Sequence, residues 1–102
     1  MSNEHMLKVG GSVIYHDEVG NPHVALITAL HCVEDERKEY PLEDVGCINV
    51  LWVSDDPNMT DNYGRQILRE SSVCHAKCGY AAHGRYYRFE DEEPNIVKNS
   101  AT

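Results

Sequence analysis

Residues 8–33, "KVGGSVIYHDEVGNPHVALITALHCV", decide the fold, because they read as two β-strands joined by a turn. Val9, Val13 and Tyr15 give an early β signal in the first strand, and a Gly-Asn-Pro sequence at 20–22 supplies residues typical of a turn. Apolar side chains then occupy both alternating sets of positions over 23–32. This pattern predicts a second strand with both faces at least partly covered.

Three more strands are predicted downstream. Residues 47–53, "CINVLWV", alternate with Ile48, Val50 and Trp52 on one face. A strand resumes over residues 63–70, and "RYYRF" at 85–89 reads as a closing strand.

The charged segment "EDERKEYPLEDVG" at 34–46 separates the second predicted strand from the third. It ends in a proline and a glycine, and few of its residues are apolar. We predict an exposed polar loop or a single short helical turn, anchored by Tyr40 and Leu42.

The five short strands together predict a mainly β fold, a small antiparallel barrel of about five strands. The opening hairpin resembles the first hairpin of SH3-like barrels, in which a V-G-x-x-V-x-Y strand precedes an A-L-I-T-A strand. That resemblance implies an SH3-like barrel. We divide the chain into a flexible N-terminus at 1–7, a single β-barrel domain at 8–89 and a disordered, mobile acidic tail at 90–102.

Length and composition restrict the function. A chain of 102 residues predicts one domain. Its net charge of -8 argues against nonspecific nucleic-acid binding, which depends on neutralising phosphates with Lys and Arg. The sequence contains no apolar run long enough to cross a membrane and no signal-peptide pattern, so we expect a cytoplasmic protein that does not bind membranes. Its four cysteines, at 32, 47, 74 and 78, are then expected to be reduced.

The segment "SSVCHAKCGYAAHGRYYRF" at 71–89 concentrates residues that carry chemistry. One hypothesis is a structural zinc site, because thiolate and imidazole suit tetrahedral zinc. The set would be Cys74, His75, Cys78 and His83. Its spacing is poor, since structural zinc sites draw their ligands from two separate knuckles. Buried, inert cysteines are the simpler interpretation.

A second hypothesis is a hydrolytic enzyme. His75 and His83 could act as an acid–base pair beside Lys77 or Arg85. The sequence places no carboxylate near either histidine, and it contains no nucleophile motif. We therefore predict that the protein is not an enzyme, has no catalytic residues and needs no cofactor.

The hypothesis we favour is a ligand-binding surface. Aromatic faces stack on planar groups, and arginine pairs with anions. The residues from 46 to 89 carry a small positive charge in an otherwise acidic chain, which suits an anionic or nucleotide-like small ligand. The predicted ligand-binding residues are Tyr63, Arg65, Gln66, His75, His83, Arg85 and Tyr87.

A second resemblance extends over roughly residues 8–88. The motifs D-x-Y-G-R-Q at 61–66, S-V-x-H at 72–75 and A-H-G-x-Y at 82–86 are similar to a group of small uncharacterised proteins from phages and mobile elements. The resemblance implies an SH3-like barrel and a phage-associated origin, and it implies no activity.

The main alternative function is an acidic interaction protein that engages a host protein, as an inhibitor or a nucleic-acid mimic. The acidic residues at 34–36 and in the tail would then carry the binding. A homodimer is a further possibility, because Trp52 and Tyr86 are expected to be partly exposed.

Overall fold

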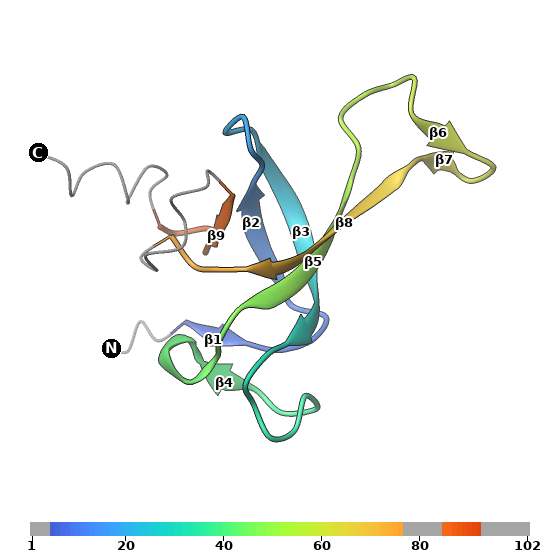
Figure 1. The fold of residues 1–102 in the computed structure, drawn as a ribbon. Coiled ribbons are helices and arrows are strands. Elements are labelled where there is room, and N and C mark those ends of the chain that lie inside the picture. The colour runs from blue at the N-terminus through green and yellow to red at the C-terminus, as the bar shows by residue number, and fades with distance from the viewer. Residues whose placement is uncertain (1–4, 77–84, 93–102) are drawn as a thin grey trace, which may run out of the picture.

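A computed structural model describes residues 5–76 and 85–92 (Figure 1). Within these ranges the chain is mainly β and contains a single short 3-10 turn, η1, at Leu42–Asp44. The strands are β1 (Met6–Leu7), β2 (Ser12–His16), β3 (Pro22–Leu30), β4 (Tyr40–Pro41), β5 (Ile48–Val53), β6 (Thr60–Asp61), β7 (Gly64–Arg65), β8 (Ile67–Val73) and β9 (Tyr86–Arg88). The described part of the chain contains no helix long and apolar enough to cross a bilayer.

Five strands form one antiparallel sheet in the order β8-β5-β3-β2-β9. The first four pair with their neighbours along the chain, and β9 returns to lie beside β2. The sheet curls into a half-barrel (Figure 1). This confirms the predicted mainly β fold with a five-stranded antiparallel sheet. The predicted short helical turn is also confirmed, as η1, whereas β4 just before it, which pairs with β1, was not predicted.

Two irregularities curl the sheet at the same level. On β3 the register shifts at Thr28, and on β8 it shifts at Ser71 and Ser72, so both shifts flank Asn49 on β5, the strand between them. The Asn49 Oδ1 atom accepts a hydrogen bond of 3.0 Å from the backbone N–H of Ser72, which has a left-handed φ of 57°. Because bulges bend a strand and increase its twist, this pair of shifts accounts for the curvature.

The two edges of the sheet, β8 and β9, approach each other at a seam. The residues just after β8 run parallel to β9: the Tyr87 N–H donates to the Cys74 carbonyl at 3.1 Å, and the Ala76 N–H donates to the Tyr87 carbonyl at 3.0 Å. Arg85 and Glu70 form an ion pair of 2.8 Å across the same gap. We call these contacts the seam, and they satisfy edge groups that would otherwise face water.

The core fills the concave side of the sheet. Ile48, Val50 and Trp52 are buried, as the alternation predicts. The other large side chains that are almost completely inaccessible are Leu7, Val13, Tyr15 and Tyr87.

Three expectations differ from this arrangement. Leu7 belongs to the predicted flexible N-terminus, yet it lies in β1 and is fully buried. Trp52 is buried, so it does not provide the exposed surface that we expected for a dimer. Most of the predicted mobile tail, residues 93–102, lies outside the described residues. Glu92, which also belongs to that predicted tail, is paired with His75.

The strand β3 also differs from its prediction, because only its concave face is covered. Ala25 and Ile27 are buried, whereas Val24 and Leu26 on the outer face are 69% and 45% exposed. The predicted strand over 63–70 is interrupted at Gln66, and its first part forms the β6–β7 hairpin, which projects away from the sheet (Figure 1).

Candidate functional site

The first three predicted binding residues lie on the β6–β7 hairpin. Tyr63 is 96% exposed at the turn, where its N–H donates to Asp61 Oδ1 at 2.7 Å. The guanidinium of Arg65 donates to the Ser54 carbonyl at 2.9 Å, and the backbone of Gln66 pairs with Ser54 and Met59. Arg65 and Gln66 therefore attach the hairpin to the end of β5.

The other predicted binding residues that the structure describes lie at the seam. Tyr87 is fully buried, and its backbone connects β9 to the segment after β8. Arg85 pairs with Glu70, and His75 is buried and paired with Glu92. His83 lies outside the described residues.

These two groups do not form one surface. β9 is an edge strand of the sheet, whereas the hairpin projects away from the sheet (Figure 1). Tyr87 cannot stack on a ligand, because its ring contacts His75 and Phe89 in the core. The six predicted residues that the structure describes therefore divide into an exposed hairpin group and a seam group whose side chains contact other parts of the protein.

Glu92 is the partner that sequence reasoning missed. Its Oε1 atom lies 2.8 Å from His75 Nε2 and accepts a hydrogen bond of 2.9 Å from the Phe89 N–H. Burial alone would raise the pKa of Glu92, but these hydrogen bonds and the nearby His75 together outweigh it and hold the pKa below its usual range. Glu92 is therefore a carboxylate at neutral pH that ties the chain after β9 to the seam.

A second histidine supports the pairing of β2 with β9. The Arg88 Nε–H donates to His16 Nε2 at 3.0 Å, and the distance from His16 Nδ1 to the Gly20 carbonyl is 3.2 Å. This pattern requires a neutral ring whose proton is on Nδ1. Burial, followed by the positive charge of Arg88, lowers the pKa of His16, although the Gly20 carbonyl acts in the opposite direction.

The predicted zinc set is not assembled within the described residues. The Sγ atom of Cys74 lies 2.7 Å from that of Cys47, while Cys78 and His83 fall outside the described ranges. No group of three or more His, Cys, Asp or Glu side chains that could hold a metal ion is found over residues 5–76 and 85–92.

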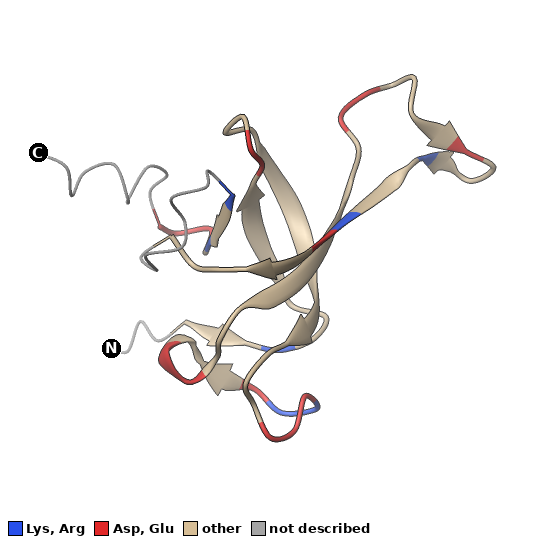
Figure 2. Ribbon diagram, viewed as in Figure 1, with Lys and Arg blue, Asp and Glu red and all other residues tan. Residues whose placement is uncertain are grey.

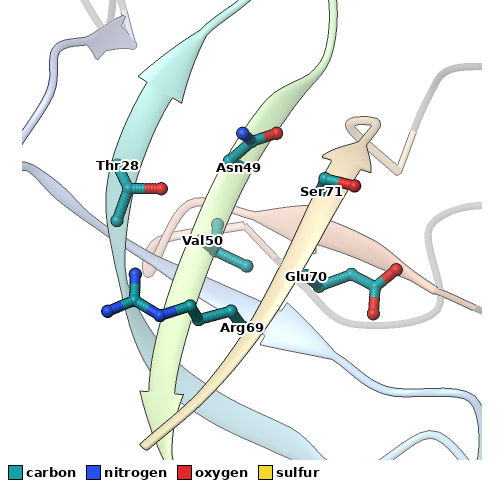
Figure 3. A pocket seen from close by; sticks show the side chains of 6 residues that line it. All are labelled: Thr28, Asn49, Val50, Arg69, Glu70 and Ser71. Carbon is teal, nitrogen blue, oxygen red and sulfur yellow. The ribbon is translucent and has the colours of Figure 1, made fainter.

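An open groove of about 330 Å³ lies on the outer face of the sheet, across β3, β5 and β8 (Figure 3). Its lining residues are Thr28, Asn49, Val50, Arg69, Glu70 and Ser71. Arg69 extends from β8 across β5 toward β3, whereas Glu70 points to the other side of β8, where it pairs with Arg85 (Figure 3). The groove lies beside the two register shifts, which the sequence did not predict.

The groove offers several hydrogen-bond donors, and its one acidic lining residue, Glu70, is paired with Arg85. Arg69 makes no hydrogen bond or ion pair with any other residue that the structure describes. The Asn49 oxygen is occupied by Ser72 and by His31, which leaves its amide N–H groups toward β3 (Figure 3). The hydroxyl group of Thr28 lies on the same side. This arrangement suits a small anion, because every one of these groups can donate.

Charge is distributed in agreement with this site. The acidic residues of the described chain lie mainly in the turns and loops (Figure 2), whereas Arg69 lies on the edge strand β8. In the acidic loop, Asp35 pairs with Arg37, and Glu36 accepts a hydrogen bond from the Leu30 N–H at 2.9 Å. These two carboxylates therefore stabilise the loop itself.

Apolar side chains continue the outer face beside the groove. Leu51 is paired with Arg69 on one side and with Leu26 on the other. In the neighbouring row, Val53 is paired with Ile67, and these side chains are 51% and 42% exposed. Sequence reasoning missed this face because it predicted a covered β3. Comparisons of the chain with family models, with curated proteins and with solved structures give no match.

Proposed function

We propose that this protein is a small, non-enzymatic binding module that holds a ligand with an anionic group and an apolar portion. The observation that carries the proposal is the position of Arg69, a cation with no acidic partner among the described residues, beside exposed apolar side chains on one sheet face. The predicted anionic ligand is retained. Its proposed site moves from the hairpin and seam to the outer groove.

The anionic group would lie between β3 and β8. Arg69 would pair with two of its oxygens, and the amide of Asn49 and the hydroxyl of Thr28 would donate to the others. The groove is open, so salt screens the attraction and affinity should fall as ionic strength rises.

The apolar portion would lie over Leu51, Leu26 and the Val53–Ile67 pair. Each 100 Å² of apolar surface removed from water contributes about 2.5 kcal/mol. These four side chains beside the groove are all aliphatic. An aliphatic portion therefore fits the site better than the base of a nucleotide.

Butyl phosphate is a suitable probe, with inorganic phosphate and butanol as its two halves. In two-dimensional NMR titrations, butyl phosphate should shift the backbone amide signals of Thr28, Asn49, Leu51 and Arg69. Affinity should be of the order of 1 mM, as expected for so small a ligand. Each half alone should bind more weakly.

Arg69→Gln should weaken binding at least about tenfold, since it removes the charge and the bidentate donor. Arg37→Gln is the matched control, because Arg37 is an exposed arginine that does not line the groove, and this variant should bind like the unaltered chain. Equal affinity of the Arg69 and Arg37 variants would contradict the proposal.

Neither alternative function has comparable support in the described residues. The acidic interaction protein would use Asp35, which is paired with Arg37, and Glu36, which accepts a hydrogen bond from the Leu30 N–H. The hydrolase would use His75, whose ring is buried against Glu92. A phage-associated origin rests on the resemblance of the motifs at 61–66, 72–75 and 82–86, and a cytoplasmic location rests on the sequence pattern alone.

A further inference from the structure

We propose that Cys47 and Cys74 form a reversible disulfide that locks β5 to the end of β8. Cys47 directly precedes β5 and Cys74 directly follows β8. The neighbouring pair Ile48 and Val73 is in register, so the two cysteines are opposite each other on antiparallel strands. Their Sγ atoms are 2.7 Å apart, within about 0.7 Å of the length of a disulfide bond.

Both cysteines are held in position by the neighbouring backbone. The carbonyl of Cys47 accepts a hydrogen bond of 3.0 Å from the His31 N–H, and the carbonyl of Cys74 accepts one of 3.1 Å from the Tyr87 N–H. Closing the bond therefore requires only a small shift of the side chains. Disulfides form readily where the backbone already holds two cysteines at the required separation.

The distance between the two Sγ atoms favours a disulfide over a zinc ion bound by both cysteines. Two thiolates on one tetrahedral zinc, each at about 2.3 Å from the metal, are separated by about 3.7 Å. The Cys47 and Cys74 sulfur atoms are closer by about 1 Å. Both thiols also line a largely apolar pocket of about 330 Å³ with Leu42, Val45 and His75, and they are partly accessible to a small reagent.

The oxidant would be a small-molecule disulfide. One cysteine thiolate attacks it, forms a mixed disulfide and releases one small thiol. The second cysteine then attacks the protein sulfur of that mixed disulfide and releases the other small thiol. One small disulfide is thus reduced to two thiols, which take up the two protons, while the two protein thiols are oxidised to one disulfide. A small dithiol reverses the exchange.

Trypsin separates all four cysteines, which makes the linkage unambiguous. Cys32 falls in residues 9–37, Cys47 in 39–65, Cys74 in 70–77 and Cys78 in 78–85. The folded, full-length protein would be treated with oxidised glutathione, alkylated, digested and examined by mass spectrometry. We expect peptides 39–65 and 70–77 to be joined until reductant is added, and the other two peptides to carry the alkyl group.

Thermal unfolding provides the second readout, on the same chain with and without reductant. The bond joins residues 27 positions apart, so oxidation should raise Tm by on the order of 10 °C. The Cys32→Ser variant should keep this rise, and the Cys47→Ser variant should lose it. A linkage that involves Cys32 or Cys78, stable glutathione adducts on both thiols, or zinc retained by Cys47 and Cys74 would each overturn the proposal.

Discussion

The β6–β7 hairpin and the seam contain the same kinds of residue in opposite settings. Tyr63 and Arg65 on the hairpin lie largely in solvent, whereas Tyr87 is buried at the seam and Arg85 is paired there with Glu70. The sequence assigns all four to one ligand-binding surface. The difference shows that residue type does not reveal whether a side chain faces solvent, where it can meet a ligand, or joins the two edges of the sheet, and that strand pairing decides it.

The two tyrosines provide the largest expected contrast. Tyr87→Ala should destabilise the fold by about 3–5 kcal/mol, because it empties a fully buried site in the core. Tyr63→Ala should change stability by less than about 0.5 kcal/mol, because the side chain is exposed. Urea unfolding of both variants measures the difference. Similar losses for the two variants would mean that Tyr63 packs against the hairpin in solution.

The carboxylates give the next largest effect. Glu92→Ala should cost about 1–3 kcal/mol, because it leaves the Phe89 N–H and the His75 ring without their acceptor in a partly buried site. Asp61→Ala, which removes only an exposed contact to the Tyr63 N–H, is the matched variant on the hairpin. It should cost about 0.5 kcal/mol. If Glu92→Ala cost no more stability than Asp61→Ala, the residues after β9 would not stabilise the seam.

The depressed pKa of Glu92 adds an acid dependence to this contact. A carboxyl whose pKa is lower in the folded state stabilises the fold above its unfolded pKa, near 4.5, and this contribution disappears as pH falls through the folded value. The stability difference between the unaltered chain and Glu92→Ala should therefore shrink between about pH 4.5 and the lower folded pKa. Urea midpoints over this range, where the unaltered chain remains folded, measure that difference.

A milder pH effect should arise at His16. The pKa of His16 is lowered in the folded state. Its contribution to the stability of the fold is therefore complete above the unfolded pKa of 6.5, and this contribution is lost as pH falls through the folded pKa. Protonation would also place a proton on the nitrogen that accepts from Arg88. Stability should decrease from pH 7.5 to 5.5, and His16→Gln should remove part of that decrease. The hairpin, residues 60–65, contains no histidine and should not contribute.

The sequence predicted the positions of the strands better than it predicted which residues from different strands lie beside each other. Ile48, Val50 and Trp52 were placed correctly because a period of two is a local signal. Tyr87 was misplaced although a local signal was present: it shares its face with Phe89, and both are buried. The groove and the Cys47–Cys74 contact depend on the register shifts beside Asn49, which no local pattern reveals. His75 and Glu92 are 17 residues apart in sequence and meet only through the seam.

The two arginines give the smallest contrast. Arg85 donates to Glu70 at 2.8 Å and Arg65 donates to the Ser54 carbonyl at 2.9 Å, and both lie near solvent. Each change to Gln should therefore cost about 0–1 kcal/mol. The salt dependence of these costs should distinguish the two variants, because an ion pair is screened more strongly than a hydrogen bond to a carbonyl. The cost of Arg85→Gln should fall between low salt and about 0.5 M salt, and that of Arg65→Gln should stay nearly constant. A salt-independent cost at Arg85 would mean that its guanidinium closes the seam by packing rather than by charge.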